Sequence, residues 1–254
     1  MNNHCFGCDF GSYHLKIYHK EQDSCLMQHN MVAVQDKKEM LAYGDEAYAM
    51  YEKAPANIQV SSPMSYGNLA SISNMQTFLK RFLESSTKGQ LKGSEYLVAL
   101  PTDMQERIFT TLIQDSSMKP KTVYLVDKPV AAGLGLGINV KEAQGVLIVD
   151  IGAGTTDVAV ISVGGVVVSA SVKVAGDNFD HAIMNYVREK HSLFIGEDAA
   201  ENIKIKIGTA SEEADLRTME VKGRNIITGL PKVATLSSEE IRTALRETTG
   251  QIVE

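Results

Sequence analysis

The fold is decided by residues 146–161, which read Val146-Leu-Ile-Val-Asp150-Ile-Gly-Ala-Gly-Thr-Thr-Asp157-Val-Ala-Val-Ile161. Apolar, β-branched runs flank a glycine-containing turn, and short apolar runs bounded by glycine predict buried strands. Because the turn is short, the strands should be antiparallel neighbours, with glycine supplying backbone angles that other residues reach only with strain. Successive N–H groups in such a turn form a nest for anions, and the threonine hydroxyls add donors. The stretch therefore predicts a phosphate-binding loop, with an ordinary hairpin as the alternative.

Asp150 and a second copy of the pattern favour the phosphate loop. Asp150 ends the first strand beside the nest, and a carboxylate beside phosphates suits Mg²⁺. The same plan recurs near the start of the chain, in Cys8-Asp9-Phe10-Gly11-Ser12-Tyr13-His14. Two such hairpins, one in each half, predict a duplicated α/β domain with a cleft between its halves. Asp9 and Asp150 would then meet at one Mg²⁺-nucleotide.

The pair of motifs resembles the actin-like ATPase superfamily, which also includes the DnaK-type chaperones and the sugar kinases. Three segments of the second half resemble more specifically MreB, the bacterial actin of rod-shape determination: 174–180, 195–208 and 219–232. The resemblance is dense over residues 122–254 and thinner before them. It implies an actin-like, ribonuclease H-like two-lobe ATPase fold with a nucleotide cleft between the lobes, and ATP and Mg²⁺ as cofactors.

The resemblance also implies lobe boundaries. Lobe I is expected over residues 1–143, with a small subdomain at about 31–66, and lobe II over 144–254, with a small subdomain at about 177–241. Relatives continue beyond the point where this chain stops, inside a predicted helix at Glu254. We therefore expect an incomplete second lobe, with a fragment or truncated gene and a natural minimal form as the two explanations.

The site implied by the resemblance is assembled from both halves. The backbone of Gly11, Ser12, Tyr13 and His14, and that of Gly152, Ala153, Gly154 and Thr155, would bind the phosphates, and Asp9 and Asp150 would hold hydrated Mg²⁺. The ribose and adenine would lie against a helix and its end, at Glu201, Asn202, Ile203, Lys204 and Gly208. An alternative for Glu201 and Lys204 is a surface ion pair, because residues three apart share a helix face.

Lys128 is the main departure from the family pattern. In the resemblance, a glutamate before a proline orients the attacking water, whereas this chain reads Asp127-Lys128-Pro129. A lysine cannot act as a carboxylate base, since its ammonium is normally protonated. Ala153 also replaces a glycine that is usual in the phosphate loop, which narrows the allowed turn angles. We expect slow or absent hydrolysis with nucleotide binding retained, and the catalytic residue stays unknown.

Bulk properties narrow the class of protein. The chain of 254 residues has a formal net charge of −6, so nucleic acid is not an expected partner. No apolar stretch reaches membrane-spanning length and no leader pattern opens the chain, so a cytoplasmic location is expected. Residues 84–94 are expected to form a polar loop whose one apolar side chain is Leu91, so the sequence does not support direct membrane binding.

The cysteines give a weaker signal. Cys5 and Cys8 form a CxxC, with His4, His14, Cys25 and His29 nearby in the sequence. A zinc site needs ligands that converge on one point, and residues three apart on a strand face opposite sides. Buried or incidental thiols are the favoured interpretation, with metal binding as the alternative.

Four local features predict helix ends. Ser73 is expected to cap a helix whose apolar stripe is Met75, Phe78, Leu79 and Phe82. Asp177 is expected to cap the helix 179–190, with a position near the nucleotide as the alternative. Gly208 is expected to end a helix in a left-handed conformation, and Ser237 with Glu240 to form a capping box.

The resulting functional expectation is a cell-shape cytoskeletal actin that binds ATP and polymerises to organise cell-wall elongation. Its partners would be copies of itself, other MreB paralogues and membrane-associated elongation proteins. The alternative is a hydrolysis-deficient regulatory relative that co-assembles with an active MreB. A metabolic kinase of the superfamily is less favoured, because it needs a catalytic carboxylate that the sequence does not offer.

Overall fold

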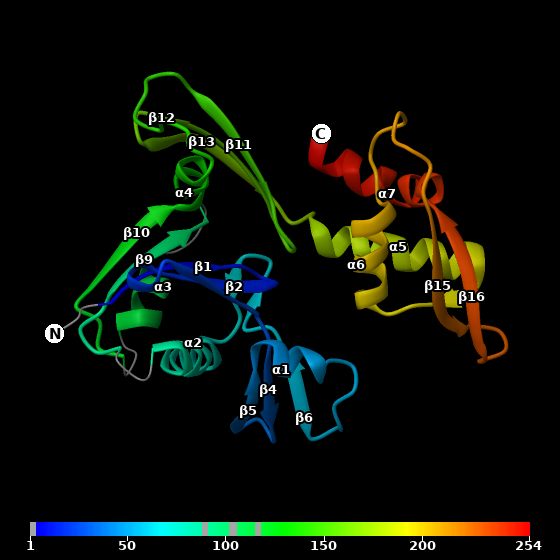
Figure 1. Ribbon diagram of the computed structural model, residues 1–254, viewed down its shortest axis with the longest axis horizontal. Coiled ribbons are helices and arrows are strands. Elements are labelled where there is room, and N and C mark those ends of the chain that lie inside the picture. Colours follow the sequence, from blue (N-terminus) through cyan, green and yellow to red (C-terminus); the bar gives the residue numbers. More distant parts are fainter. Residues whose placement is uncertain (1–3, 88–90, 102–105, 115–117) are drawn as a thin grey trace. The chain divides into compact units, whose positions relative to one another are not determined.

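The computed structural model describes residues 4–87, 91–101, 106–114 and 118–254 (Figure 1). By its internal contacts the chain divides into two compact units. The first unit is Met1–Ala153 with Asp157–Ser171, and the second is Gly154–Thr156 with Val172–Glu254. The lobe and subdomain boundaries expected from the sequence remain predictions.

A five-stranded sheet forms the centre of the first unit, in the order β10-β9-β1-β2-β3. Its strands are β1 (Cys5–Phe10), β2 (His14–His19), β3 (Ser24–His29), β9 (Glu95–Leu100) and β10 (Thr122–Asp127). The hairpin β1–β2 is antiparallel, as predicted, and β9 runs parallel to both β1 and β10. Strand β3 was not predicted, because its burial alternates only weakly and Met27 and Cys25 are exposed.

Helices α2 (Ile72–Thr87) and α3 (Glu106–Gln114) cover one face of this sheet (Figure 1). Their apolar stripes pack with the alternate residues of β1 and β9, so Phe6, Phe78, Tyr96 and Phe109 are all buried in one core. Residues 84–87, expected as loop, continue α2, and Leu91 is buried in the same core rather than exposed.

A smaller sheet of the first unit has the order β5-β4-β6. It consists of β4 (Val32–Gln35), β5 (Glu39–Tyr43) and β6 (Ile58–Ser61), and α1 (Gly44–Ala49) follows β5 directly. The short 3-10 turn η1 (Lys20–Gln22) belongs instead to the five-stranded sheet, where it joins β2 to β3. A two-stranded ribbon follows, of β7 (Met64–Ser65) and β8 (Asn68–Leu69). Alanines 33, 42 and 47 form the small core between α1 and the sheet.

The central glycine turn joins two strands of a three-stranded sheet, β11 (Val146–Ile151), β12 (Thr156–Ser162) and β13 (Gly165–Val172). Helix α4 (Lys128–Gly135) packs with it through Val130, Ile148 and Ile161. A Cβ on Gly133 would lie 2.8 Å from Ile161 Cδ1, so glycine allows the helix to approach the sheet.

The second unit contains three helices and a three-stranded antiparallel sheet. Its elements are α5 (Gly176–His191), β14 (Leu193–Phe194), α6 (Glu197–Ile207), β15 (Thr218–Asn225), β16 (Pro231–Ser237) and α7 (Ser238–Val253). One apolar core holds them together, with Ile183, Ile203, Leu236 and Ile241 fully buried. None of the helices in the described part of the chain is both long and apolar enough to cross a membrane.

The capping box at the start of α7 is confirmed. Ser237 Oγ accepts from the Glu240 N–H at 3.2 Å, and Glu240 Oε2 accepts from the Ser237 N–H at 2.9 Å. Two other capping predictions were wrong. Helix α2 begins earlier, and Ser71 rather than Ser73 accepts from the Asn74 N–H. Asp177 lies inside the first turn of α5, while the Asn178 side chain accepts from the Ala175 N–H.

The predicted left-handed Gly208 was also wrong. Its φ of −64° and ψ of 140° are extended. Glycine is required there for a different reason: a Cβ would lie 2.3 Å from the carbonyl oxygen of Lys204, inside the last turn of α6. Glycine is therefore needed at position 208 because a side chain would clash with the backbone of α6, and not because of a positive φ.

Candidate functional site

Asp9, Lys128 and Asp150 meet in the first unit. Strands β1, β9 and β10 are parallel neighbours, so Asp9 near the end of β1 and Lys128 just after β10 lie at the same edge of the sheet. Lys128 Nζ lies 3.2 Å from Asp150 Oδ2 and 3.7 Å from Asp9 Oδ1. Pro129 follows in the first turn of α4, where a missing N–H costs nothing. The two aspartates predicted from the repeated motif therefore converge, and a lysine lies between them.

A second lysine reaches one of these two carboxylates. Lys16 on β2 is the register partner of Asp9 on β1, and its Nζ lies 3.6 Å from Asp9 Oδ2. Sequence reasoning missed Lys16, although its position opposite Asp9 follows once the hairpin register is known. All of these side chains are partly exposed, so the group is accessible to water.

The environment keeps Lys128 charged. Burial disfavours its ammonium, but the carboxylates of Asp9 and Asp150, together with Asp157, outweigh burial and raise the pKa of Lys128 above its ordinary value. The lysine is therefore a fixed cation at neutral pH. A fixed cation cannot remove a proton from water, which agrees with the expectation drawn from Asp127-Lys128-Pro129.

The surroundings of Asp9 and Asp150 bear on whether they could bind Mg²⁺. Carboxylate oxygens are the right chemistry, and Mg²⁺ requires near-octahedral oxygen ligands at about 2.0–2.1 Å. Here both carboxylates face the Lys128 ammonium, and Asp9 also faces Lys16. The arrangement as it stands does not fit Mg²⁺, and the assignment of Asp9 and Asp150 as metal ligands remains a prediction.

The first predicted phosphate turn is held tightly. Gly11 N–H donates to the His14 carbonyl at 3.1 Å, and a Cβ on Gly11 would lie 2.6 Å from that oxygen. Ser12 Oγ accepts from the Gly67 N–H at 3.1 Å. The Tyr13 hydroxyl lies 3.0 Å from that of Tyr48. The side chains of this turn therefore contact residues 48–67, and the Gly11 N–H, expected to bind phosphate, is bonded within the turn.

The second predicted phosphate turn differs in its backbone. None of Gly152, Ala153 and Gly154 has a positive φ, so the expected demand for left-handed angles was wrong, and Ala153 fits without that strain. The hydroxyl of Thr156, which ends the turn, donates to the Val174 carbonyl at 2.7 Å and is fully buried. It is thus committed within the protein, while Thr155 remains a predicted phosphate contact.

The residues predicted to contact ribose and adenine gather on α6 in the second unit. Lys204 Nζ lies 2.6 Å from Asp180 Oδ2 on α5 and donates to the Gly176 carbonyl at 3.3 Å. Asn202 donates to the Asp198 carbonyl of its own helix at 2.8 Å. Ile203 is fully buried in the core of the second unit, so its side chain is not exposed to a ligand. Their roles at a nucleotide, with those of Glu201 and Gly208, stay predictions.

Asp180 was not singled out from the sequence. Burial raises its pKa to about 6, against the opposing effect of Lys204, while Glu201 and Asp177 add to the increase. Its Oδ1 is buried without a hydrogen-bond partner among the described residues. The signal was available in principle, because Asp180 and Lys204 occur in two segments that resemble MreB, but only the packing of α5 on α6 brings them together.

Among the described residues, Cys5 and Cys8 do not belong to a group of three metal-ligating side chains, and Cys8 is buried. Burial, with Asp9 and Cys5 nearby, raises the pKa of Cys8 to about 12, which opposes the thiolate that a metal needs. Of the histidines near it in sequence, His4 lies instead beside His19 and Glu21, with 2.9 Å between His4 Nδ1 and His19 Nε2. His29 pairs with Asp45 at 2.6 Å.

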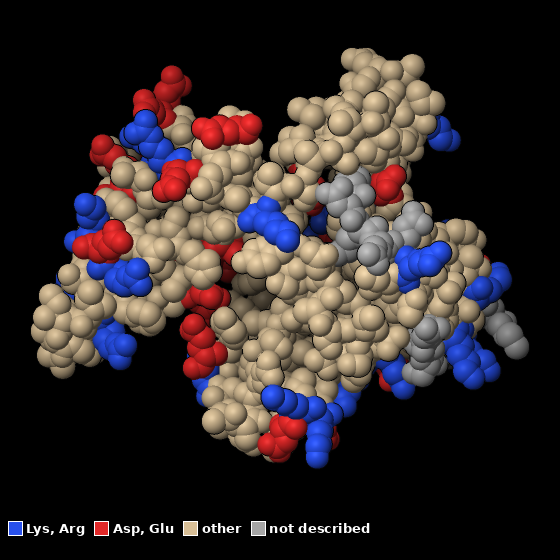
Figure 2. All heavy atoms as spheres, turned by 180° about the vertical axis from the view of Figure 1, so that it is seen from behind, with Lys and Arg blue, Asp and Glu red and all other residues tan. Residues whose placement is uncertain are grey.

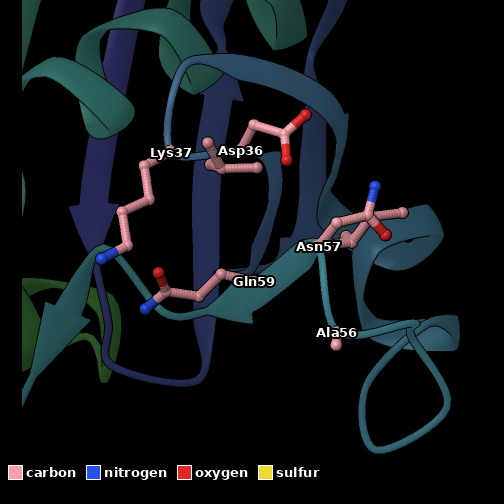
Figure 3. Close-up of a pocket in the computed structure, with 7 residues that line it drawn as sticks. Asp36, Lys37, Ala56, Asn57 and Gln59 are labelled. Carbon is pink, nitrogen blue, oxygen red and sulfur yellow. The ribbon is translucent and has the colours of Figure 1, made fainter.

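A hollow of about 560 Å³ lies elsewhere in the first unit, at the end of the small sheet (Figure 3). It is lined by Val34, Asp36, Lys37, Ala56, Asn57, Ile58 and Gln59. None of these residues was predicted to bind nucleotide, and the hollow has no role in the site above. Figure 2 shows acidic and basic side chains interspersed on one face of the molecule.

Comparison with known proteins agrees with this architecture. The family model for the MreB/Mbl protein matches residues 3–254. The cell shape-determining protein MreB of Escherichia coli K12 is 39% identical over 255 residues, covering 96% of this chain and 73% of the relative. MreB 5 of Spiroplasma citri, crystallised with AMPPNP, superposes with a TM-score of 0.91 at 34% identity, over 100% of this chain and 77% of that one. A double helical filament of MamK matches at a TM-score of 0.78 and 20% identity, over 99% of this chain and 78% of that one, which concerns the fold alone.

The family match over nearly the whole chain agrees with the repeated glycine hairpins, the converging aspartates and the α/β units described above. The chain belongs to the MreB/Mbl family of cell shape-determining proteins and has the actin-like fold.

Proposed function

We propose that this chain is a cytoskeletal actin subunit that binds ATP and assembles with copies of itself to organise cell-wall elongation. The observation that carries the proposal is the convergence of Asp9 and Asp150, each of which lies next to the last residue in the first strand of a glycine hairpin. The AMPPNP complex of Spiroplasma citri MreB 5 supports nucleotide binding by this fold. MamK, which has the same fold, forms a double helical filament, and self-association of this chain is proposed by analogy.

The phosphates would bind along the two glycine turns, Gly11–His14 and Gly152–Thr155. Helix N-termini and nests of N–H groups are suited to anions, and Lys16 and Lys128 add positive charge beside them. The base and ribose would lie against α6, at Glu201, Lys204 and Gly208. Membrane recruitment would depend on partner proteins, including other MreB paralogues.

A second candidate is favoured by Lys128. Hydrolysis requires a group that orients and deprotonates water, and Lys128 is a permanent cation held by Asp9 and Asp150. The chain would then be a hydrolysis-deficient subunit that co-assembles with an active MreB and stabilises its nucleotide-bound state. Both candidates bind nucleotide, and they differ in self-sufficient assembly.

Calorimetric titration with ATP is the first test, with Asp150→Ala as the matched variant. We expect binding by the unaltered chain and at least tenfold weaker binding by the variant, which corresponds to about 1.4 kcal/mol. Absence of binding by the unaltered chain would contradict the proposal. Sedimentation then separates the candidates, because only a self-assembling actin pellets alone with ATP.

Phosphate release sharpens the second candidate. If Lys128 blocks hydrolysis, Lys128→Glu should increase phosphate release, by roughly the 10²-fold or more that general base catalysis contributes. An unchanged rate in a variant that still binds ATP would show that something other than Lys128 limits hydrolysis.

A further inference from the structure

Lys128 does more than lack a carboxylate. Its ammonium faces both predicted metal ligands at once, at 3.2 Å from Asp150 and 3.7 Å from Asp9. The two acids come from separate sheets, β1 and β11, and Lys128 opens the helix that packs on the second of them. Lys128 therefore forms ion pairs with both aspartates, Asp9 on β1 and Asp150 on β11, which a shared Mg²⁺ would also contact.

Positive charge is already present beside the two carboxylates without an added ion. The ammonium groups of Lys16 and Lys128 face Asp9 and Asp150, and a third carboxylate, Asp157, also acts on Lys128. Mg²⁺ entering between the carboxylates would face the Lys128 ammonium at close range and would have to displace it. Because Mg²⁺ also dehydrates reluctantly, the repulsion is not offset by direct contacts.

An ammonium can take over part of the role of a bound cation. It is a compact point charge with three donors, and lysine is a common phosphate ligand in nucleotide sites. Held by Asp9 and Asp150, Lys128 has fewer positions to explore than a lysine on a free surface. Its positive charge stays with the protein when nucleotide leaves, which a diffusible ion does not.

We propose that Lys128 replaces Mg²⁺ in this chain, so that ATP binds without a divalent cation, the lysine ammonium offsetting the phosphate charge. This rests on the proposed nucleotide-binding function and deepens it. It predicts that affinity for nucleotide is insensitive to Mg²⁺ and falls with ionic strength, as expected for a charge partly exposed to solvent.

The test is calorimetric titration of the full chain with AMPPNP, chosen to avoid turnover, in Mg²⁺ and in EDTA. The unaltered chain should show affinities within about threefold of each other in the two buffers. Lys128→Met removes the charge at similar length and should bind at least about tenfold more weakly in EDTA than in Mg²⁺. Lys128→Arg keeps the charge and should remain insensitive to Mg²⁺.

A matched control is Lys80→Met, because Lys80 pairs only with Glu84 across a turn of α2 in the described residues. It should behave as the unaltered chain. Thermal unfolding of each variant in both buffers shows whether it is folded at the titration temperature. Lys128→Gln, which also removes the positive charge, replaces Lys128→Met if that variant does not fold, with the same expected result.

Each outcome bears on the inference. Binding by the unaltered chain only in Mg²⁺ overturns it and leaves the proposed function intact. Equal affinities of Lys128→Met in the two buffers also overturn it, because the lysine would then be irrelevant to the cation requirement. Absence of AMPPNP binding by the unaltered chain in both buffers overturns the inference and the proposed function together.

Discussion

The two glycine hairpins have the same sequence plan and different surroundings. In β1 every second residue is buried, and Phe6 is fully covered by the helices under its sheet. In β11 the corresponding apolar residues Leu147, Val149 and Ile151 are half exposed or more, at 62, 50 and 52%. One hairpin is therefore part of a large core, whereas the other presents an apolar face to solvent.

The turn of the first hairpin is also more tightly constrained than the turn of the second. Gly11 has no room for a side chain, and its loop is tied to Tyr48 and Gly67. The second turn tolerates alanine at position 153. Both hairpins keep the aspartate, but the burial of their strands and the space around their turns differ. Mutations at matched positions should therefore have unequal effects.

The largest difference is expected in the strands. Phe6→Ala should lower the free energy of unfolding by about 3–5 kcal/mol, because a fully buried aromatic ring is lost from a packed core. Leu147→Ala, at the exposed position of β11, should change it by about 0.5 kcal/mol or less. Denaturant unfolding of both variants measures the two values. Similar losses would mean that the β11 face is covered in solution.

The turns should give the next largest difference. Gly11→Ala places a Cβ against the His14 carbonyl, which is backbone and cannot rotate away, so a loss of about 1–3 kcal/mol is expected. Ala153→Gly should cost at most about 1 kcal/mol, through the greater freedom of the unfolded chain. The same unfolding assay compares them, and a near-neutral Gly11→Ala would show that the first turn can relax.

Local sequence patterns predicted the hairpin β1–β2 and the capping box of α7, because each depends on residues a few positions apart. Helix starts at Ser73 and Asp177 were misplaced, since serine and asparagine neighbours can cap as well and tertiary packing decides. The clustering of Asp9 with Lys128, and of Asp180 with Lys204, depends on topology. The periodicity of a sequence does not predict contacts between residues that are so far apart in the chain.

Removing one hydroxyl from each turn should change the free energy of unfolding by about the contribution of one hydrogen bond. Thr156→Val leaves the Val174 carbonyl without the hydroxyl that contacts it inside the protein, and a loss of about 1–2 kcal/mol is expected. Tyr13→Phe removes one side of a partly buried pair with Tyr48 and should cost about 0.5–1.5 kcal/mol. Denaturant unfolding again gives both values. A larger effect at Tyr13 would show that the contact with α1 is coupled to other interactions of the first turn.

The smallest effect concerns how each hairpin is tied at its open end. In the first, both carboxylate oxygens of Glu21 accept from the Cys5 N–H at 3.1 Å. Burial opposes the charge of Glu21, but these bonds and the nearby His19 and His4 outweigh it and lower the pKa of Glu21 from its ordinary value. In the second, Ser162 Oγ donates to the Ala143 carbonyl at 2.9 Å, which involves no charge.

Only the first tie should therefore depend on pH. A carboxylate whose pKa is lower in the folded state contributes stability that is present above its unfolded pKa and is lost as pH falls through the folded value. Glu21→Gln should weaken the protein slightly at pH 7 and progressively less below about pH 4.5. Ser162→Ala should have the same small effect at both pH values. Unfolding curves at pH 7 and in acid check this, with Glu39→Gln as an exposed control. A pH-independent loss in Glu21→Gln would mean that the hydrogen bond, rather than the charge, holds the first hairpin closed.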